Sequence, residues 1–90
     1  MDKITLDAML TAHKIIAQAT DDAMRSTDYE PSNNEMLYEF MTEMCSNILA
    51  NDFITGKYTP MEYNAIRNQL AKLLWTLFEK HIEADNGHAC

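Results

Sequence analysis

Apolar residues recur every three to four positions along most of the chain, and this spacing predicts amphipathic helices. The first predicted helix covers residues 6–24, with Thr5 as its N-cap, and carries one such row for about five turns. The members of this row are Leu6, Met9, Leu10, His13, Ile16, Ala17, Thr20, Ala23 and Met24. Beside it runs a row of mostly small residues, namely Ala8, Ala12, Ile15 and Ala19. Small side chains permit another helix to approach closely, so this helix is predicted to have two packed sides.

The second predicted helix covers residues 33–53. Ser32 followed by Glu35 matches a capping box, in which each side chain bonds to the other residue's backbone N–H. Its apolar residues fall within half of the helical circumference and are Met36, Leu37, Phe40, Met41, Met44, Cys45 and Ile48. Glu35, Glu39 and Glu43 fall on the opposite side or at its edge.

The third predicted helix covers residues 60–84, and its start has the clearest signal in the chain. Thr59 is suited to the N-cap, Pro60 to the first helical position and Glu62 to a capping box, while Gly56 is suited to a left-handed turn after the preceding helix. The main apolar row is Tyr63, Ile66, Leu70, Leu73, Leu74, Leu77 and His81, and a flanking row is Ala71, Trp75, Phe78 and Ile82. Residues 85–90 are predicted to form a flexible tail.

These boundaries predict a single domain, residues 1–90, with an all-α, up-down-up three-helix bundle fold. Short connections make successive helices antiparallel when they pack on each other. The apolar surface is wider than such a bundle needs, above all on the third helix. We therefore expect a homodimer whose interface includes Ala71, Trp75, Phe78 and Ile82.

Charge and composition restrict the classes of partner. The chain of 90 residues has 14 acidic and 7 basic residues, a net charge of -7, which disfavours direct binding to nucleic acid or to anionic lipid. No apolar run is long enough to span a membrane, and Asp7, His13 and Lys14 interrupt the N-terminal segment, so we expect neither a signal peptide nor a membrane span. Cys45 and Cys90 are too few for a disulfide scaffold, which indicates free thiols and a cytoplasmic location.

Candidate metal sites match their motifs poorly. With Gly56 at the sixth position of a calcium-binding EF-hand loop, Glu62 takes the twelfth, but Phe53 and Thr55 stand where the third and fifth ligands belong. A set of His81, His88 and Cys90 lacks the paired close spacing of a structural zinc site.

Catalytic signals are equally weak. His13 lies in an apolar row without a Glu three positions before it, so it is interpreted as a histidine of the core or its boundary. The chain contains no Gly-rich phosphate loop, nucleophile elbow or Cys-x-x-Cys pair. We expect no enzyme, no cofactor and no bound metal, and keep a small metal-binding protein or enzyme as the third functional hypothesis.

The acidic residues are distributed unevenly. Between Ser26 and Gly56 there are six acids and no Lys or Arg. Glu35, Glu39 and Glu43 recur every four residues, which makes a ladder rising about 6 Å per step, comparable with phosphates along a nucleic acid strand. A ladder of this kind could imitate DNA on a basic surface, as some small phage inhibitors do, or could simply face solvent.

The leading hypothesis is a small, acidic, non-enzymatic interaction or regulatory module that docks through helix faces, with methionines that adapt to a partner. The alternative is a phage- or prophage-type inhibitor that mimics nucleic acid with its acidic helix face. Association of the mimic should weaken steeply with ionic strength, whereas apolar docking should hardly respond.

Overall fold

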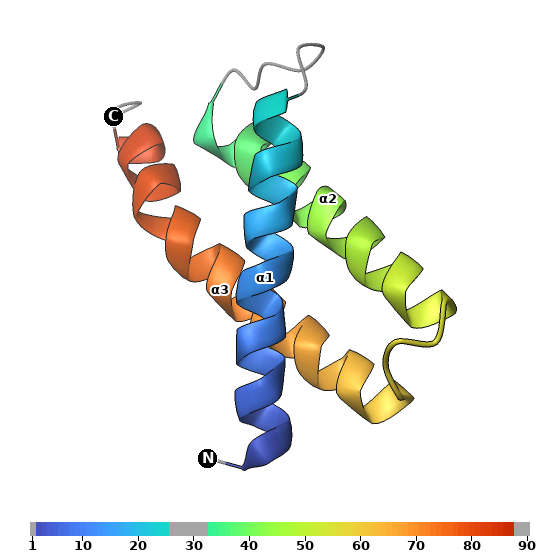
Figure 1. Ribbon diagram of the computed structural model, residues 1–90. Coiled ribbons are helices and arrows are strands. Elements are labelled where there is room, and N and C mark those ends of the chain that lie inside the picture. Colours follow the sequence, from blue (N-terminus) through green and yellow to red (C-terminus); the bar gives the residue numbers. More distant parts are fainter. Residues whose placement is uncertain (1, 26–32, 88–90) are drawn as a thin grey trace.

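The computed structural model describes residues 2–25 and 33–87, without the side chains of residues 81 and 83–87. It consists of three helices, α1 (Lys3–Arg25), α2 (Asn34–Ile54) and α3 (Pro60–Gly87), and the described part of the chain contains no strand. All three pairs of helices are in contact. In Figure 1, α1 and α3 run upward and α2 runs downward, which confirms the predicted up-down-up, all-α arrangement.

The starts of α1 and α2 differ from the prediction because other residues cap them. Asp2 caps α1, since its Oδ1 accepts a hydrogen bond of 2.7 Å from the N–H of Thr5. The helix therefore begins at Lys3, and the expected cap, Thr5, lies inside it. Asn33 caps α2, since its Oδ1 accepts a hydrogen bond of 2.8 Å from the N–H of Met36. The prediction of Ser32 as this N-cap is wrong, and Ser32 itself lies outside the described residues.

The connection between α2 and α3 is the one that the sequence predicts. Gly56 has a φ of 88°, in the left-handed region that favours glycine. Its N–H donates to the carbonyl of Phe53 at 3.0 Å, and the N–H of Lys57 donates to the carbonyl of Asp52 at 3.0 Å. This pair of bonds is a Schellman motif, which satisfies carbonyl groups at the end of α2.

The predicted capping box starts α3. The N–H of Thr59 donates to Oε1 of Glu62 at 2.9 Å, and the N–H of Glu62 donates back to the Thr59 hydroxyl at 3.1 Å. The helix continues to Gly87 instead of ending near residue 84. Part of the expected tail is therefore helical, because Gly87 is the first strong helix breaker after Pro60. Residues 88–90 lie outside the described part.

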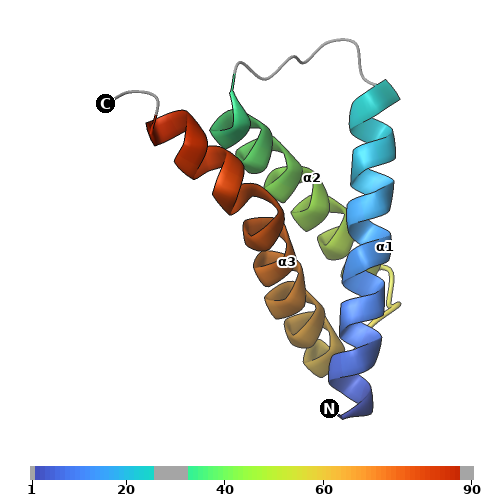
Figure 2. The same cartoon turned by 90° about the vertical axis from the view of Figure 1, so that its left-hand side faces the viewer.

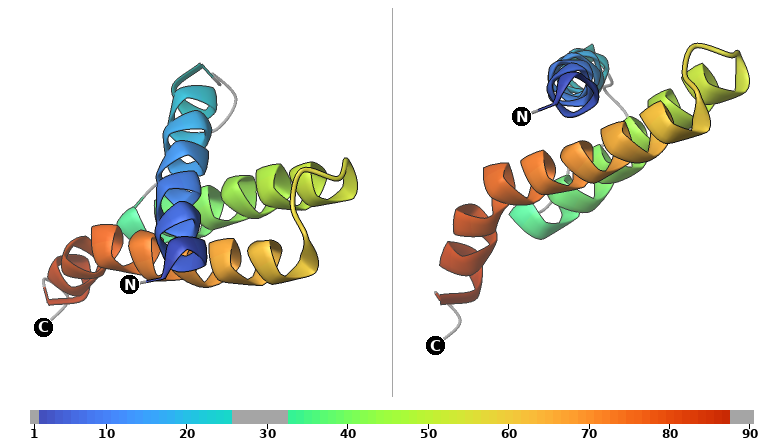
Figure 3. Two further views of the ribbon diagram at one scale, coloured as in Figure 1. Left: turned by 60° about the horizontal axis from the view of Figure 1, so that its bottom comes forward. Right: turned by 90° about the horizontal axis from the view of Figure 1, so that it is seen from below.

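The core is built from one row of each helix. The row from α1 is the small-residue row, which allows α1 to lie close against the pair formed by α2 and α3 (Figure 3). The core residues are Ala8, Ala12, Ile15 and Ala19 of α1, Met41, Cys45 and Leu49 of α2, and Ile66, Leu70 and Leu74 of α3. The predicted second packed row of α1 is thus its main contribution to the core.

Much of the first row of α1 faces solvent. Leu6 is 49% exposed, Leu10 54% and Met24 81%. His13 is exposed as well, so its assignment to the core or its boundary is wrong. The reason is steric, since the row that allows the shortest distance between helices is the one that becomes buried.

Candidate functional site

An apolar groove lies where α1 separates from the other two helices. Figure 2 shows that the C-terminal half of α1 diverges from the pair formed by α2 and α3. The groove between them has a volume of about 560 Å³. It is lined by Ile16, Thr20, Ala23 and Met24 of α1, by Asn34, Leu37, Phe40 and Met41 of α2, and by Leu77 and Phe78 of α3.

The lining favours an apolar occupant. Eight of the ten lining side chains are apolar, and the two polar ones, Thr20 and Asn34, are uncharged. Met41 is only 5% exposed and lies deep in the groove, whereas Met24 and Leu77 are 81% and 53% exposed at its edge. Two methionines in the lining can adapt their conformation to the shape of an apolar side chain. A charged ligand would find no countercharge among the lining residues.

Aromatic contacts fix one wall of the groove. The ring of Tyr38 on α2 meets Phe78 edge-on, with centroids 5.7 Å apart, and meets Trp75 edge-on at 5.8 Å. Phe78 therefore lines the groove and also packs against the core. These contacts join α2 to the C-terminal half of α3, so that both helices form one continuous wall of the groove.

The structure divides the predicted interface residues of α3 into two groups. Ala71 and Trp75 are exposed, Trp75 to 45%. Phe78 is half-buried against Tyr38, and Ile82 is only 9% exposed within the single chain. The first pair is thus accessible to a partner, while the second pair contributes to the packing of the monomer.

The three glutamates of the acidic ladder lie together on the outer face of α2. Glu35, Glu39 and Glu43 are all exposed. Within the part of the chain that the structure describes, the ion pairs are Asp21 with Arg25 at 3.1 Å and Asp52 with Lys57 at 3.3 Å, so none of the three glutamates is paired with a base there.

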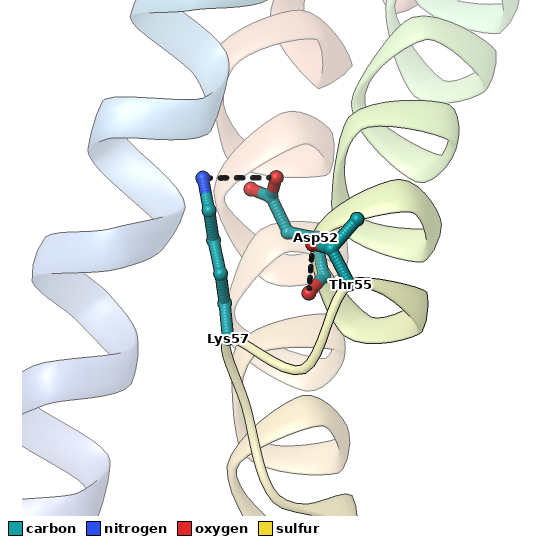
Figure 4. A network of polar contacts seen from close by, with 3 residues as sticks. All are labelled: Asp52, Thr55 and Lys57. Carbon is teal, nitrogen blue, oxygen red and sulfur yellow. Dashed lines mark hydrogen bonds and ion pairs between the residues drawn. The ribbon is translucent and has the colours of Figure 1, made fainter.

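The turn that was compared with an EF-hand loop is held by internal contacts (Figure 4). The ammonium group of Lys57 pairs with the carboxylate of Asp52, and the Thr55 hydroxyl donates to the Asp52 carbonyl at 3.1 Å. Burial and the nearby Asp52 carboxylate raise the pKa of Tyr58. Among the described residues, no group of three or more His, Cys, Asp or Glu could hold a metal ion. His88 and Cys90 lie outside these residues, and the side chain of His81 is not described.

The groove was not predicted from the sequence, although all of its lining residues except Asn34 lie on predicted apolar faces. Leu37, Phe40 and Leu77 belong to predicted apolar faces, but their use as a groove depends on the divergence of α1. The surplus of apolar surface over that needed by three helices was the available signal.

Comparison with protein-family models, curated proteins and solved structures finds no match for this chain. None of the described helices is both long enough and apolar enough to cross a membrane. The interpretation of function therefore depends on the groove and on the exposed faces of the helices.

Proposed function

We propose that the protein is a non-enzymatic interaction module that binds an amphipathic helix of another protein in the groove between α1, α2 and α3. The open apolar groove is the observation that carries this proposal. Its volume of about 560 Å³ lies in the range of ordinary ligand pockets, and its walls are helices. A partner helix placed there would complete a four-helix arrangement and cover the exposed sides of Met24 and Leu77.

The charge of the chain specifies the partner further. The net charge is -7, and the described part of α2 contains Glu35, Glu39, Glu43 and Asp52 but no Lys or Arg. We expect the partner helix to have large apolar residues on one face and basic residues beside them. The apolar face would provide most of the affinity, and the basic residues would raise the association rate.

The test compares groove variants with a matched surface variant. Leu77→Glu places a carboxylate at the groove edge, at a residue that is already 53% exposed, so the fold should persist. Met61→Glu makes a similar change at a 65% exposed residue outside the groove. Proteins captured from the native host by the tagged wild type should be retained by Met61→Glu and lost by Leu77→Glu. A captured partner that binds all three proteins equally would exclude the groove as its site.

The acidic ladder supports a second candidate, an inhibitor that occupies a nucleic-acid-binding surface. The supporting observation is the exposure of Glu35, Glu39 and Glu43 without a paired base among the described residues. Replacing all three by Gln should abolish capture of such a target, and its binding should weaken steeply between low and moderate salt. Groove docking should survive both changes, apart from a lower association rate.

We also propose that the protein forms a homodimer. Leu6, Leu10 and Met24 on α1 and Trp75 on α3 leave large apolar side chains exposed on the single chain. Exposed apolar surface of this kind is typical of association faces.

A further inference from the structure

The outer face of α1 carries a heptad pattern that the core does not use. Six exposed residues follow one another at intervals of four, three, four, three and four positions. They are Leu6, Leu10, His13, Ala17, Thr20 and Met24, and we call this row the α1 seam. This spacing is that of the a and d positions of a coiled coil, where one helix packs along another. The core takes the opposite side of α1, from Ala8 to Ala19.

The arrangement of the helices leaves space along the seam. Seen from below in Figure 3, α1 lies on one side of the layer formed by α2 and α3, and neither of these two helices covers its far side. A second helix can therefore run along α1 without meeting the described parts of α2 or α3.

We propose that two copies of this chain associate through the α1 seam, with their α1 helices antiparallel. A twofold axis makes identical seams complementary to each other. The register that we propose places Leu10 opposite His13 of the second copy and Leu6 opposite Ala17 of the second copy. In these four central layers one large apolar side chain faces a smaller or more polar one, which suits close packing, while Thr20 lies opposite Lys3 at each end of the overlap.

Charges beside the seam select this register. One flank carries Asp7, Lys14 and Asp21, seven residues apart and all exposed. In the proposed register, Asp7 lies at an axial offset of about 3 Å from Lys14 of the second copy, and the twofold axis repeats the pair. Like charges of the same flank, such as Lys14 and Lys14 of the second copy, are then offset by about 7.5 Å or more.

Other arrangements lack this complementarity. Shifting the antiparallel pair by one heptad, toward full overlap, brings Lys14 next to Lys14 of the second copy and Asp7 next to Asp21 of the second copy. In a parallel pair, this charged flank faces the apolar flank that includes Met9 and Ile16, and His13 meets its own copy. Charge complementarity therefore favours a second copy of this chain, antiparallel and in one register.

The size of the contact indicates a weak dimer. The two helices overlap from Lys3 to Thr20, about 27 Å, which buries on the order of 1,000 Å² in total, at the low end for specific interfaces. The α1 seam shares only Thr20 and Met24 with the groove, and Met24 lies beyond the overlap. The dimer and the proposed binding of a partner helix in the groove can thus fail separately.

Sedimentation equilibrium between about 10 and 200 µM, with reductant present to exclude a disulfide through Cys90, tests the proposal. Leu10→Glu should weaken dimerisation by at least about tenfold, while Met61→Glu and Leu77→Glu should not change it. Circular dichroism of each variant checks that the helices are intact. A wild type that stays monomeric up to 200 µM, or a dimer that Leu10→Glu leaves unchanged, would overturn the proposal.

A charge reversal tests the register. Asp7→Lys alone, or Lys14→Asp alone, places like charges together twice in each dimer and should weaken it by about tenfold. The double variant has the net charge of the wild type and restores both opposite-charge pairs, so it should recover most of the lost affinity. Additive losses in the double variant would exclude the proposed antiparallel register.

Discussion

The thiol of Cys45 is completely enclosed by the three helices, with an exposed fraction of 0%. Burial raises its pKa from the ordinary 9.0 to about 11, because the thiolate would lose its hydration. The unfolded chain therefore releases this proton at lower pH than the folded chain. The stability that follows is fully present below about pH 9 and is lost as the pH rises toward 11.

Between pH 8 and pH 11, the free energy of unfolding should fall by roughly 2 kcal/mol more in the wild type than in Cys45→Ala. Urea unfolding at a series of pH values measures this difference. The tyrosines and Cys90 are common to both proteins, so their effects cancel in the comparison. Equal pH dependence of the two proteins would mean that the thiol is less desolvated than its packing indicates.

Alanine occurs on both faces of α1, with opposite consequences for substitution. Ala12 is 0% exposed, whereas Ala17 is exposed in the α1 seam. Ala12→Leu adds volume where the helices are closest, and we expect it to lower the free energy of unfolding by about 1–3 kcal/mol. Ala17→Leu should leave the stability of the monomer within about 0.5 kcal/mol. Thermal and urea unfolding of the two variants measure the contrast, and similar losses would contradict the orientation of α1.

At the scale of the elements, helix ends were predictable where interactions between neighbouring residues determine them. Thr59 and Glu62 form the capping box of α3, and Gly56 adopts the left-handed conformation in the turn after α2, as their sequence pattern indicates. Asp2 and Asn33 were missed as the N-caps of α1 and α2 because adjacent polar residues compete for the same capping role. Such competition is decided by differences of less than about 1 kcal/mol.

The choice between the two rows of α1 could not be made from hydrophobicity. Leu6 and Leu10 are more apolar than Ala12 and Ala19, yet the alanines are the buried residues. Burial depends on how near the backbones come, and small side chains allow the nearest approach. The sequence showed both rows, but the packing of α2 and α3 decided which one became the core.

The outer face of α2 concentrates like charges at the spacing at which they interact. Glu39 stands four residues from both Glu35 and Glu43, and all three are exposed. Glu39→Lys replaces two repulsive contacts by two attractive ones, so it should raise the free energy of unfolding by about 0.5–1 kcal/mol. Glu39→Gln, which removes only the repulsion, should give about half of that gain. Urea unfolding at low salt measures both, and no gain in either variant would show that the ladder is already screened.

At the scale of the whole molecule, the groove depends on the direction of α1 relative to the pair of α2 and α3. Both ends of that pair are joined locally, by the short turn at Gly56 and by the contact of Tyr38 with Phe78. Among the described residues, no aromatic pair or tight turn joins α1 to the other two helices, and its angle results from the sum of many small contacts. The groove therefore had to come from the structure, while the residues that line it were visible in the sequence.

The net charge of -7 on a molecule with a radius of gyration of 14.4 Å predicts a dependence of stability on salt. At about 0.01 M salt the screening length exceeds this radius, so the acids repel one another across the whole molecule. Raising NaCl to about 0.2 M should stabilise the fold by roughly 1 kcal/mol, measured by thermal unfolding. Glu39→Lys changes the net charge from -7 to -5 and should show a smaller gain. Destabilisation by salt would instead mean that ion pairs such as Asp52 with Lys57 outweigh the general repulsion.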